Sequence, residues 1–91
     1  MNYRIRSDLE MKKLEGMLQK AGIPYVMKDS FMGGKRLIYR NEKNPVINAD
    51  VISDGYGWDQ GFLEIQGLGY DSVPLTAEEI FAAIKNDHYK D

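Results

Sequence analysis

The stretch from Ser7 to Pro24, SDLEMKKLEGMLQKAGIP, predicts the first helix and, through it, much of the fold. Ser7 and Glu10 form a capping box, in which the serine hydroxyl accepts from the Glu10 amide and the glutamate reaches back to the serine amide. The apolar residues that follow recur at helical spacing and form one stripe: Met11, Leu14, Met17, Leu18 and Ala21. Gly22 provides a left-handed cap and Pro24 cannot continue a helix, so we expect the helix over residues 8–21.

Four short β-prone segments, separated by turn residues, predict a sheet downstream of this helix. They lie at residues 23–28, 37–39, 46–52 and 62–66. Pro24, near the start of the first segment, is typical of an edge strand because proline cannot donate a hydrogen bond to a neighbouring strand. The short connections favour an antiparallel meander.

A second capping box, from Thr76 to Glu79, predicts a C-terminal helix whose apolar stripe also needs an apolar face to cover. We therefore predict one α+β domain over residues 1–91, in the order α-β-β-β-β-α. Its two layers are a four-stranded antiparallel meander and the two helices, both packed on one face of the sheet. The expected shared core consists of Leu14, Leu18, Leu37, Ile47, Val51, Leu63, Ile65, Ile80, Phe81 and Ile84.

The composition narrows the class of protein. The 91 residues are 43% hydrophobic and 11% aromatic, which suits one small core and is too apolar for a disordered chain. The chain has no cysteine, so it holds no disulfide and no thiolate metal site. No apolar run has the length of a signal peptide or a membrane span, so we expect a cytoplasmic protein without a membrane partner.

Charge is unevenly distributed along the chain. Residues 1–40 carry nine basic and four acidic residues, a net +5, whereas residues 41–91 carry three basic and ten acidic residues, a net −7. A nucleic-acid surface would use the basic half, and its candidate residues are Lys12, Lys13, Lys35, Arg36 and Arg40. The net charge of −2 and the acidic residues near the aromatic loop make nucleic acid the weaker hypothesis.

Residues 54–61, DGYGWDQG, place a tyrosine and a tryptophan in a polar, glycine-rich loop. A loop that only joins two strands needs about two to five residues, so these aromatic side chains either cover the core or anchor a partner. Tyr56, Trp58 and Asp59 are therefore the candidate protein-binding residues, with Trp58 as the anchor. If Trp58 is exposed, Trp58→Ala should leave the melting temperature unchanged and abolish partner capture.

Patterns that would indicate catalysis are weak. Four acidic residues could hold a hard cation, but their spacing fails the EF-hand pattern: Asp50, Asp54, Asp59 and Glu64. The glycine-rich loop lacks a Walker pattern and leads into a strand and not into a helix N-terminus, which favours a hairpin loop over a phosphate loop. His88 could act as a general base with Glu64 or Asp91, although a place near a helix C-terminus also explains it. We predict no catalytic residue, no metal and no cofactor.

Three motifs of the chain occur in similar form in one group of proteins: AGIPY at residues 21–25, GFLEIQG at 61–67 and VPLTAEEIF at 73–81. In these motifs the chain resembles small uncharacterised phage and prophage proteins of low-GC Gram-positive bacteria. The resemblance implies a mobile-element origin and a host-cytoplasm setting, and it implies no activity.

The leading hypothesis is therefore a non-enzymatic, phage-type accessory protein that binds a host or phage protein. The first alternative is a nucleic-acid-binding module that uses the basic N-terminal half. The second is a small metal-dependent or acid/base enzyme.

Overall fold

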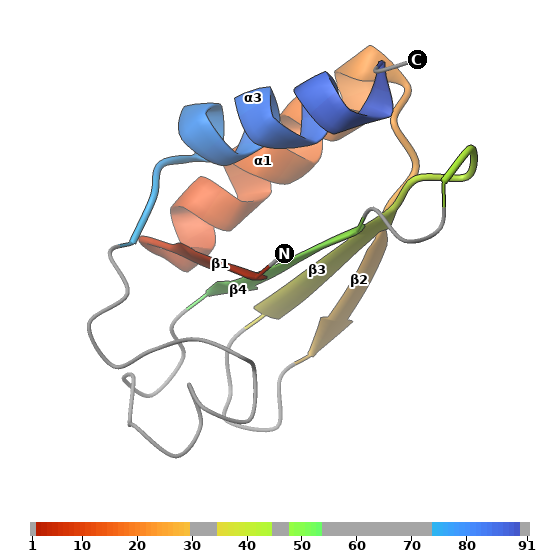
Figure 1. The fold of residues 1–91 in the computed structure, drawn as a ribbon. Helices are drawn as coiled ribbons and strands as arrows, with labels where there is room; N and C mark the ends of the chain where they lie inside the picture. Colours follow the sequence, from red (N-terminus) through yellow and green to blue (C-terminus); the bar gives the residue numbers. More distant parts are fainter. Residues whose placement is uncertain (1, 30–34, 45–47, 54–73, 90–91) are drawn as a thin grey trace.

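Four strands and two helices make up the computed structural model, which describes residues 2–29, 35–44, 48–53 and 74–89 (Figure 1). In chain order they are β1 (Asn2–Ile5), α1 (Asp8–Ala21), β2 (Val26–Asp29), β3 (Lys35–Arg40), β4 (Asn48–Ser53) and α3 (Ala77–His88). The predicted α+β class is confirmed. Both helices lie over the same face of the sheet, and both begin at the same end of the molecule (Figure 1).

The sheet is mixed, so the prediction of a purely antiparallel meander is wrong. Its strand order is β1-β4-β3-β2. The pairs β2–β3 and β3–β4 are antiparallel, whereas β1 is parallel to β4, with Tyr3 opposite Val51. The described elements therefore begin with a strand and not with a helix. The predicted strand at residues 62–66 lies outside the described residues.

The first strand escaped prediction because it is short. Tyr3 and Ile5 pack toward the core and Arg4 between them lies on the other face, but this alternation spans only four residues. Ile5 is fully buried in the core. Its place beside β4 depends on pairing with residues about 48 positions away, which no local pattern reveals.

The ends of α1 follow the predicted signals in part. The Ser7 hydroxyl accepts from the Glu10 amide at 3.1 Å, and Gly22 ends the helix with φ of 72°. The predicted return contact of Glu10 is replaced by a longer-range one, because Glu10 Oε2 accepts a hydrogen bond from the Ala77 amide at 2.8 Å. That amide is among the unsatisfied donors at the start of α3, where the helix dipole also favours a carboxylate.

The capping box of α3 forms as predicted. The Thr76 hydroxyl accepts from the Glu79 amide at 3.2 Å, and a Glu79 carboxylate oxygen accepts from the Thr76 amide at 3.2 Å. At the other end of α3, His88 Nδ1 lies 3.0 Å from the Tyr39 hydroxyl. The end of α3 is thereby tied to β3.

The core fills the space between the helices and the sheet. It consists of Ile5, Met11, Leu14, Leu18, Ile23, Leu37, Tyr39, Ala49, Val51, Ala77, Ile80 and Ile84. Phe81 was expected in this core but is only partly buried at its edge. Ile47, Leu63 and Ile65 lie outside the described residues. Each fully buried Leu or Ile side chain contributes about 1.5–3 kcal/mol.

Candidate functional site

The two edges of the sheet differ in what they leave for a partner. At the β1 edge, the Leu75 amide donates to the Arg4 carbonyl at 2.7 Å and the Arg6 amide donates to the Leu75 carbonyl at 3.2 Å. The other edge is formed by β2, and no strand in the described ranges pairs with its outer side. Within the described chain, the sheet thus has one covered edge and one open edge.

The open edge offers backbone hydrogen-bonding groups over a short stretch. In an antiparallel pair, every second residue turns its N–H and C=O away from its neighbour, so β2 presents about two donors and acceptors outward. Pro24 precedes this strand, and the charged residues Lys28 and Asp29 end it. Proline and charged residues commonly protect an edge strand from pairing with other chains. Between them, Val26 is 52% exposed. The accessible part of the edge is therefore short and apolar.

A first hollow, which we call the helix-side hollow, lies between α1 and the β2 edge. It has a volume of about 420 Å³ and is lined by Asp8, Met11, Lys12, Glu15, Met27 and Lys35. Among its described lining residues, Met27 and the buried Met11 are the apolar ones, and methionine side chains adapt readily to ligands of different shape. Charged groups surround this apolar surface. The helix-side hollow can therefore take an apolar side chain at a charged rim.

A second hollow, the outer hollow, lies at the same edge on the opposite face of the sheet. Its volume is about 220 Å³, and it is lined by Pro24, Tyr25, Val26, Ile38, Arg40 and Glu42. Side chains alternate between the two faces of a strand. A strand added to β2 would therefore point its side chains alternately toward the helix-side hollow and the outer hollow.

Three of the charged residues that line the helix-side hollow, Asp8, Lys35 and Glu15, form contacts within the described residues. Asp8 Oδ1 accepts from the buried Ser53 hydroxyl at 2.6 Å. The hydrogen bond from Lys35 to Asp29, at 2.5 Å, raises the pKa of Lys35. Burial raises the pKa of the Tyr25 hydroxyl, and its hydrogen bond with the Glu15 side chain raises that pKa further.

Lys12 and Lys13, neighbours on α1, differ in the contacts of their side chains. Lys13 forms an ion pair with Glu78 of α3; this contact raises the pKa of Lys13 and lowers that of Glu78. Lys12 is exposed on the rim of the helix-side hollow, between Asp8 and Glu15 in the sequence. Among the described residues, Lys12 has no ion pair and no hydrogen bond of its side chain.

The structure does not bring the five candidate nucleic-acid residues together on one surface. Lys12 and Lys13 lie on α1, and Lys35 lies at the helix-side hollow. Arg36 and Arg40 alternate with the core residues of β3 and therefore face the opposite side of the sheet. Arg36 is also paired with Asp50, at 2.6 Å. The positive charge of these five residues is therefore divided between the helix side and the opposite face of the sheet.

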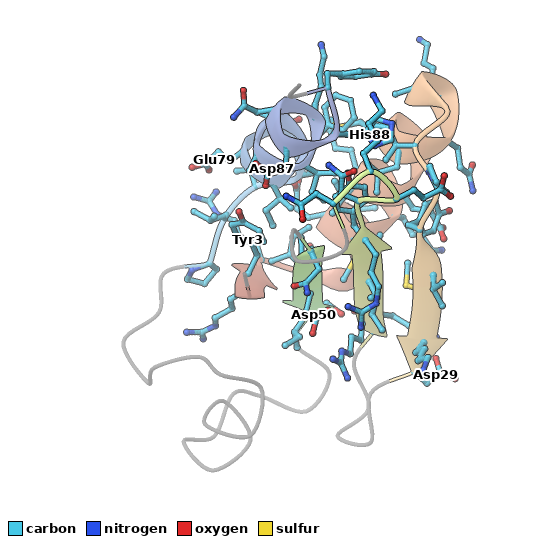
Figure 2. The ribbon with its side chains drawn as sticks, turned by 45° about the vertical axis from the view of Figure 1, so that its right-hand side comes forward. Tyr3, Asp29, Asp50, Glu79, Asp87 and His88 are labelled. Carbon is cyan, nitrogen blue, oxygen red and sulfur yellow. The ribbon has the colours of Figure 1, made fainter. Side chains whose placement is uncertain are left out.

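The candidate binding residues Tyr56, Trp58 and Asp59 lie outside the described residues, as do Asp54, Glu64 and Asp91, so their roles stay predictions. His88, Asp29 and Asp50 lie well apart, with Asp29 at the far end of β2 (Figure 2). The described ranges contain no group of three His, Cys, Asp or Glu residues that could hold a metal ion.

The sequence interpretation missed Val26 and Met27 as candidate binding residues. The signal that could have found them is Pro24, which correctly predicted an edge strand. That Met27 joins Met11 in one hollow depends on α1 lying beside β2, which only the folded chain shows.

No protein-family model matches this chain, and no curated protein and no solved structure matches it either. In the part of the chain that the structure describes, neither helix is long and apolar enough to cross a membrane.

Proposed function

We propose that this chain is a non-enzymatic accessory protein that binds another protein by adding an extended segment of the partner to the edge of β2. The observation that carries the proposal is the open edge of β2 between two hollows, one on each face of the sheet. In strand addition, backbone hydrogen bonds supply affinity and alternating side-chain sites supply specificity.

The broader proposal is a phage-type protein that acts on a host or phage protein in the cytoplasm, and the resemblance in three motifs supports it. One of these motifs, AGIPY at residues 21–25, ends α1 and leads directly into β2. The segment that carries the resemblance therefore also positions the proposed binding edge. The aromatic loop with Trp58 stays a second predicted contact.

The expected affinity is modest. Backbone hydrogen bonds contribute about 0.5–1.5 kcal/mol each, and an apolar side chain in each hollow adds about 1.5–3 kcal/mol when fully buried. Ordering an extended segment and losing its free motion offsets part of this gain. We expect dissociation constants on the order of 10–100 μM for isolated segments.

Nucleic-acid binding has weaker support. Three of its five candidate cations, Lys13, Lys35 and Arg36, already form ion pairs with acidic side chains. Phosphate contacts would have to replace these pairs, and the candidates are divided between the two faces of the sheet. Tight, salt-sensitive binding of single-stranded DNA or RNA would reverse this ranking.

A displayed library of random peptides about ten residues long tests the proposal. Val26→Asp places a carboxylate on the open edge, and Leu9→Asp is the matched control because Leu9, at 76% exposed, projects from α1. We expect peptides to be enriched on the unmodified chain and on Leu9→Asp but not on Val26→Asp. Thermal melts of both variants check that the fold is retained.

Nuclear magnetic resonance then locates the bound peptide. Amide signals of Val26–Asp29 should shift on titration, and those of Asn2–Ile5 should not, because Leu75 already covers the β1 edge. Failure to enrich any peptide, or enrichment that Val26→Asp leaves intact, would refute strand addition at β2.

A further inference from the structure

Lys12 gives the helix-side hollow a preference among possible partners. It stands on the rim of this hollow, and the two acidic residues of α1 that flank it there form hydrogen bonds with hydroxyl groups of other segments. Asp8 accepts from Ser53, and Glu15 lies beside the Tyr25 hydroxyl. Lys12 is thus the cation at this site whose charge a ligand can neutralise without displacing a partner from the described residues.

We infer that the segment bound along β2 carries an acidic side chain two positions from an apolar one, both directed toward α1, and that Lys12 selects it. This inference rests on the proposed function. Residues two apart in a strand lie on the same face, about 6.6–6.8 Å from each other, so one can enter the helix-side hollow while the other reaches its rim. The acidic group of the segment then forms an ion pair with Lys12 next to the apolar contact in the hollow.

The residue between these two faces the outer hollow. Val26 and Ile38 make that hollow largely apolar, so an apolar residue fits there as well. The favoured segment is therefore apolar–apolar–acidic, in either chain direction, because an edge strand can accept a parallel or an antiparallel partner. A segment with a basic residue at the acidic position would meet Lys12 with like charge.

A second copy of this chain fits the site less well. Its β2 carries Met27 and Asp29 two positions apart, which matches the pattern. Lys12 lines the hollow together with Met27, so the partner's Asp29 would have to lie opposite Met27. In an antiparallel two-fold pair, that register sets Lys28 directly opposite the partner's Lys28, and like charges opposite each other are destabilising. The proposed occupant is therefore a segment of a different protein.

The test uses the same library of random peptides, followed by affinity measurements on individual synthetic peptides. We expect the enriched sequences to carry Asp or Glu two positions from an aliphatic residue. For one such fluorescently labelled peptide, replacing the acid by its amide should weaken binding to the unmodified chain about three- to fivefold, as an exposed ion pair would. The same replacement should have almost no effect on Lys12→Gln.

Lys20→Gln is the matched control, because Lys20 is an exposed lysine of α1 that does not line the hollow. It should retain the full difference between the acid and amide peptides, and raising the salt concentration should reduce that difference. Acid and amide peptides of equal affinity, or the same ratio in Lys12→Gln as in the unmodified chain, would overturn the assignment of Lys12 and leave strand addition standing.

Measuring self-association tests whether a second copy of the chain occupies the β2 edge. Sedimentation of the chain over a wide concentration range should show a monomer. A dimer that Val26→Asp dissociates and Leu9→Asp does not would overturn the inference in favour of a second copy. A library that enriches no sequence at all would overturn the proposed function itself.

Discussion

Replacing Glu10 by alanine tests how α1 and α3 are joined at their first turns. Glu10 Oε2 accepts from the Ala77 amide at 2.8 Å, so a side chain of one helix caps the other. Loss of a helix cap costs about 0.5–2 kcal/mol, and a hydrogen bond to a charged group contributes about 1.5–3 kcal/mol. Because Glu10 is only partly buried, we expect Glu10→Ala to lower the free energy of unfolding by about 1.5 kcal/mol.

Thermal and urea unfolding measure this loss. In a domain of this length, about 1.5 kcal/mol corresponds to a fall in melting temperature of about 6–12 °C. Glu10→Gln keeps an oxygen acceptor but loses the charge, so we expect roughly half the effect. Glu42→Ala is the control, because Glu42 is an exposed carboxylate after β3, and its removal should change stability by no more than about 0.5 kcal/mol.

Hydrogen exchange identifies the capped amide directly. In Glu10→Ala, the Ala77 amide should exchange faster, while the Glu79 amide, which donates to Thr76, serves as an internal reference. If the Ser7 amide lost its protection and the Ala77 amide kept it, the local capping box would be the correct account and the helix-to-helix cap would be refuted. A loss no larger than that of Glu42→Ala would refute it as well.

Three further substitutions test the packing and charge contacts. Ile84→Ala should cost about 3–4 kcal/mol in urea unfolding and Phe81→Ala only about 1–2 kcal/mol, because Ile84 is 1% exposed and Phe81 lies at the edge of the core; the reverse order would contradict this core. Asn41→Ala should cost about 2 kcal/mol, since Asn41 is 3% exposed and bonds the end of α3 and the turn after β3, and a neutral result would contradict that role. Lys13→Gln should lower stability near neutral pH. Because the pair lowers the pKa of Glu78, its stabilising effect is present above the unfolded pKa of Glu78 and is lost as pH falls through the folded pKa. The difference in stability between Lys13→Gln and the unmodified chain should therefore disappear at low pH. A difference that does not change with pH would contradict the Lys13–Glu78 pair.

Local signals in the sequence correctly predicted where both helices begin and where α1 ends. The Ser7 hydroxyl contact to Glu10 and the capping box of Thr76 and Glu79 each join residues three positions apart. Gly22 adopts the left-handed conformation that few other residues adopt easily. Such contacts depend on the backbone of a single turn, so the sequence specifies them without knowledge of the rest of the fold.

The candidate site was predictable only in part. Pro24 indicated that the strand after α1 lies at an edge, and among the described strands β2 does lie at an edge of the sheet. Lys12 was selected from the sequence as a possible phosphate contact, on charge alone. Its position on the rim of a hollow with Met11 and Met27 arises because α1 packs beside β2, and side chains 15 or more positions apart then share one cavity.

Amino-acid sequence alone thus determined the class of the domain, its two helices, their caps and the edge character of β2. Tertiary structure decided that β1 joins β4 in parallel, that Leu75 covers one edge of the sheet, and that Glu10 caps α3. The physical reason is the same in each case. A backbone or carboxylate group can form the same hydrogen bond with several chemically equivalent partners, and it forms that bond with the partner that packing brings nearest. For Glu10 this partner is the Ala77 amide, which lies 67 positions away in the sequence.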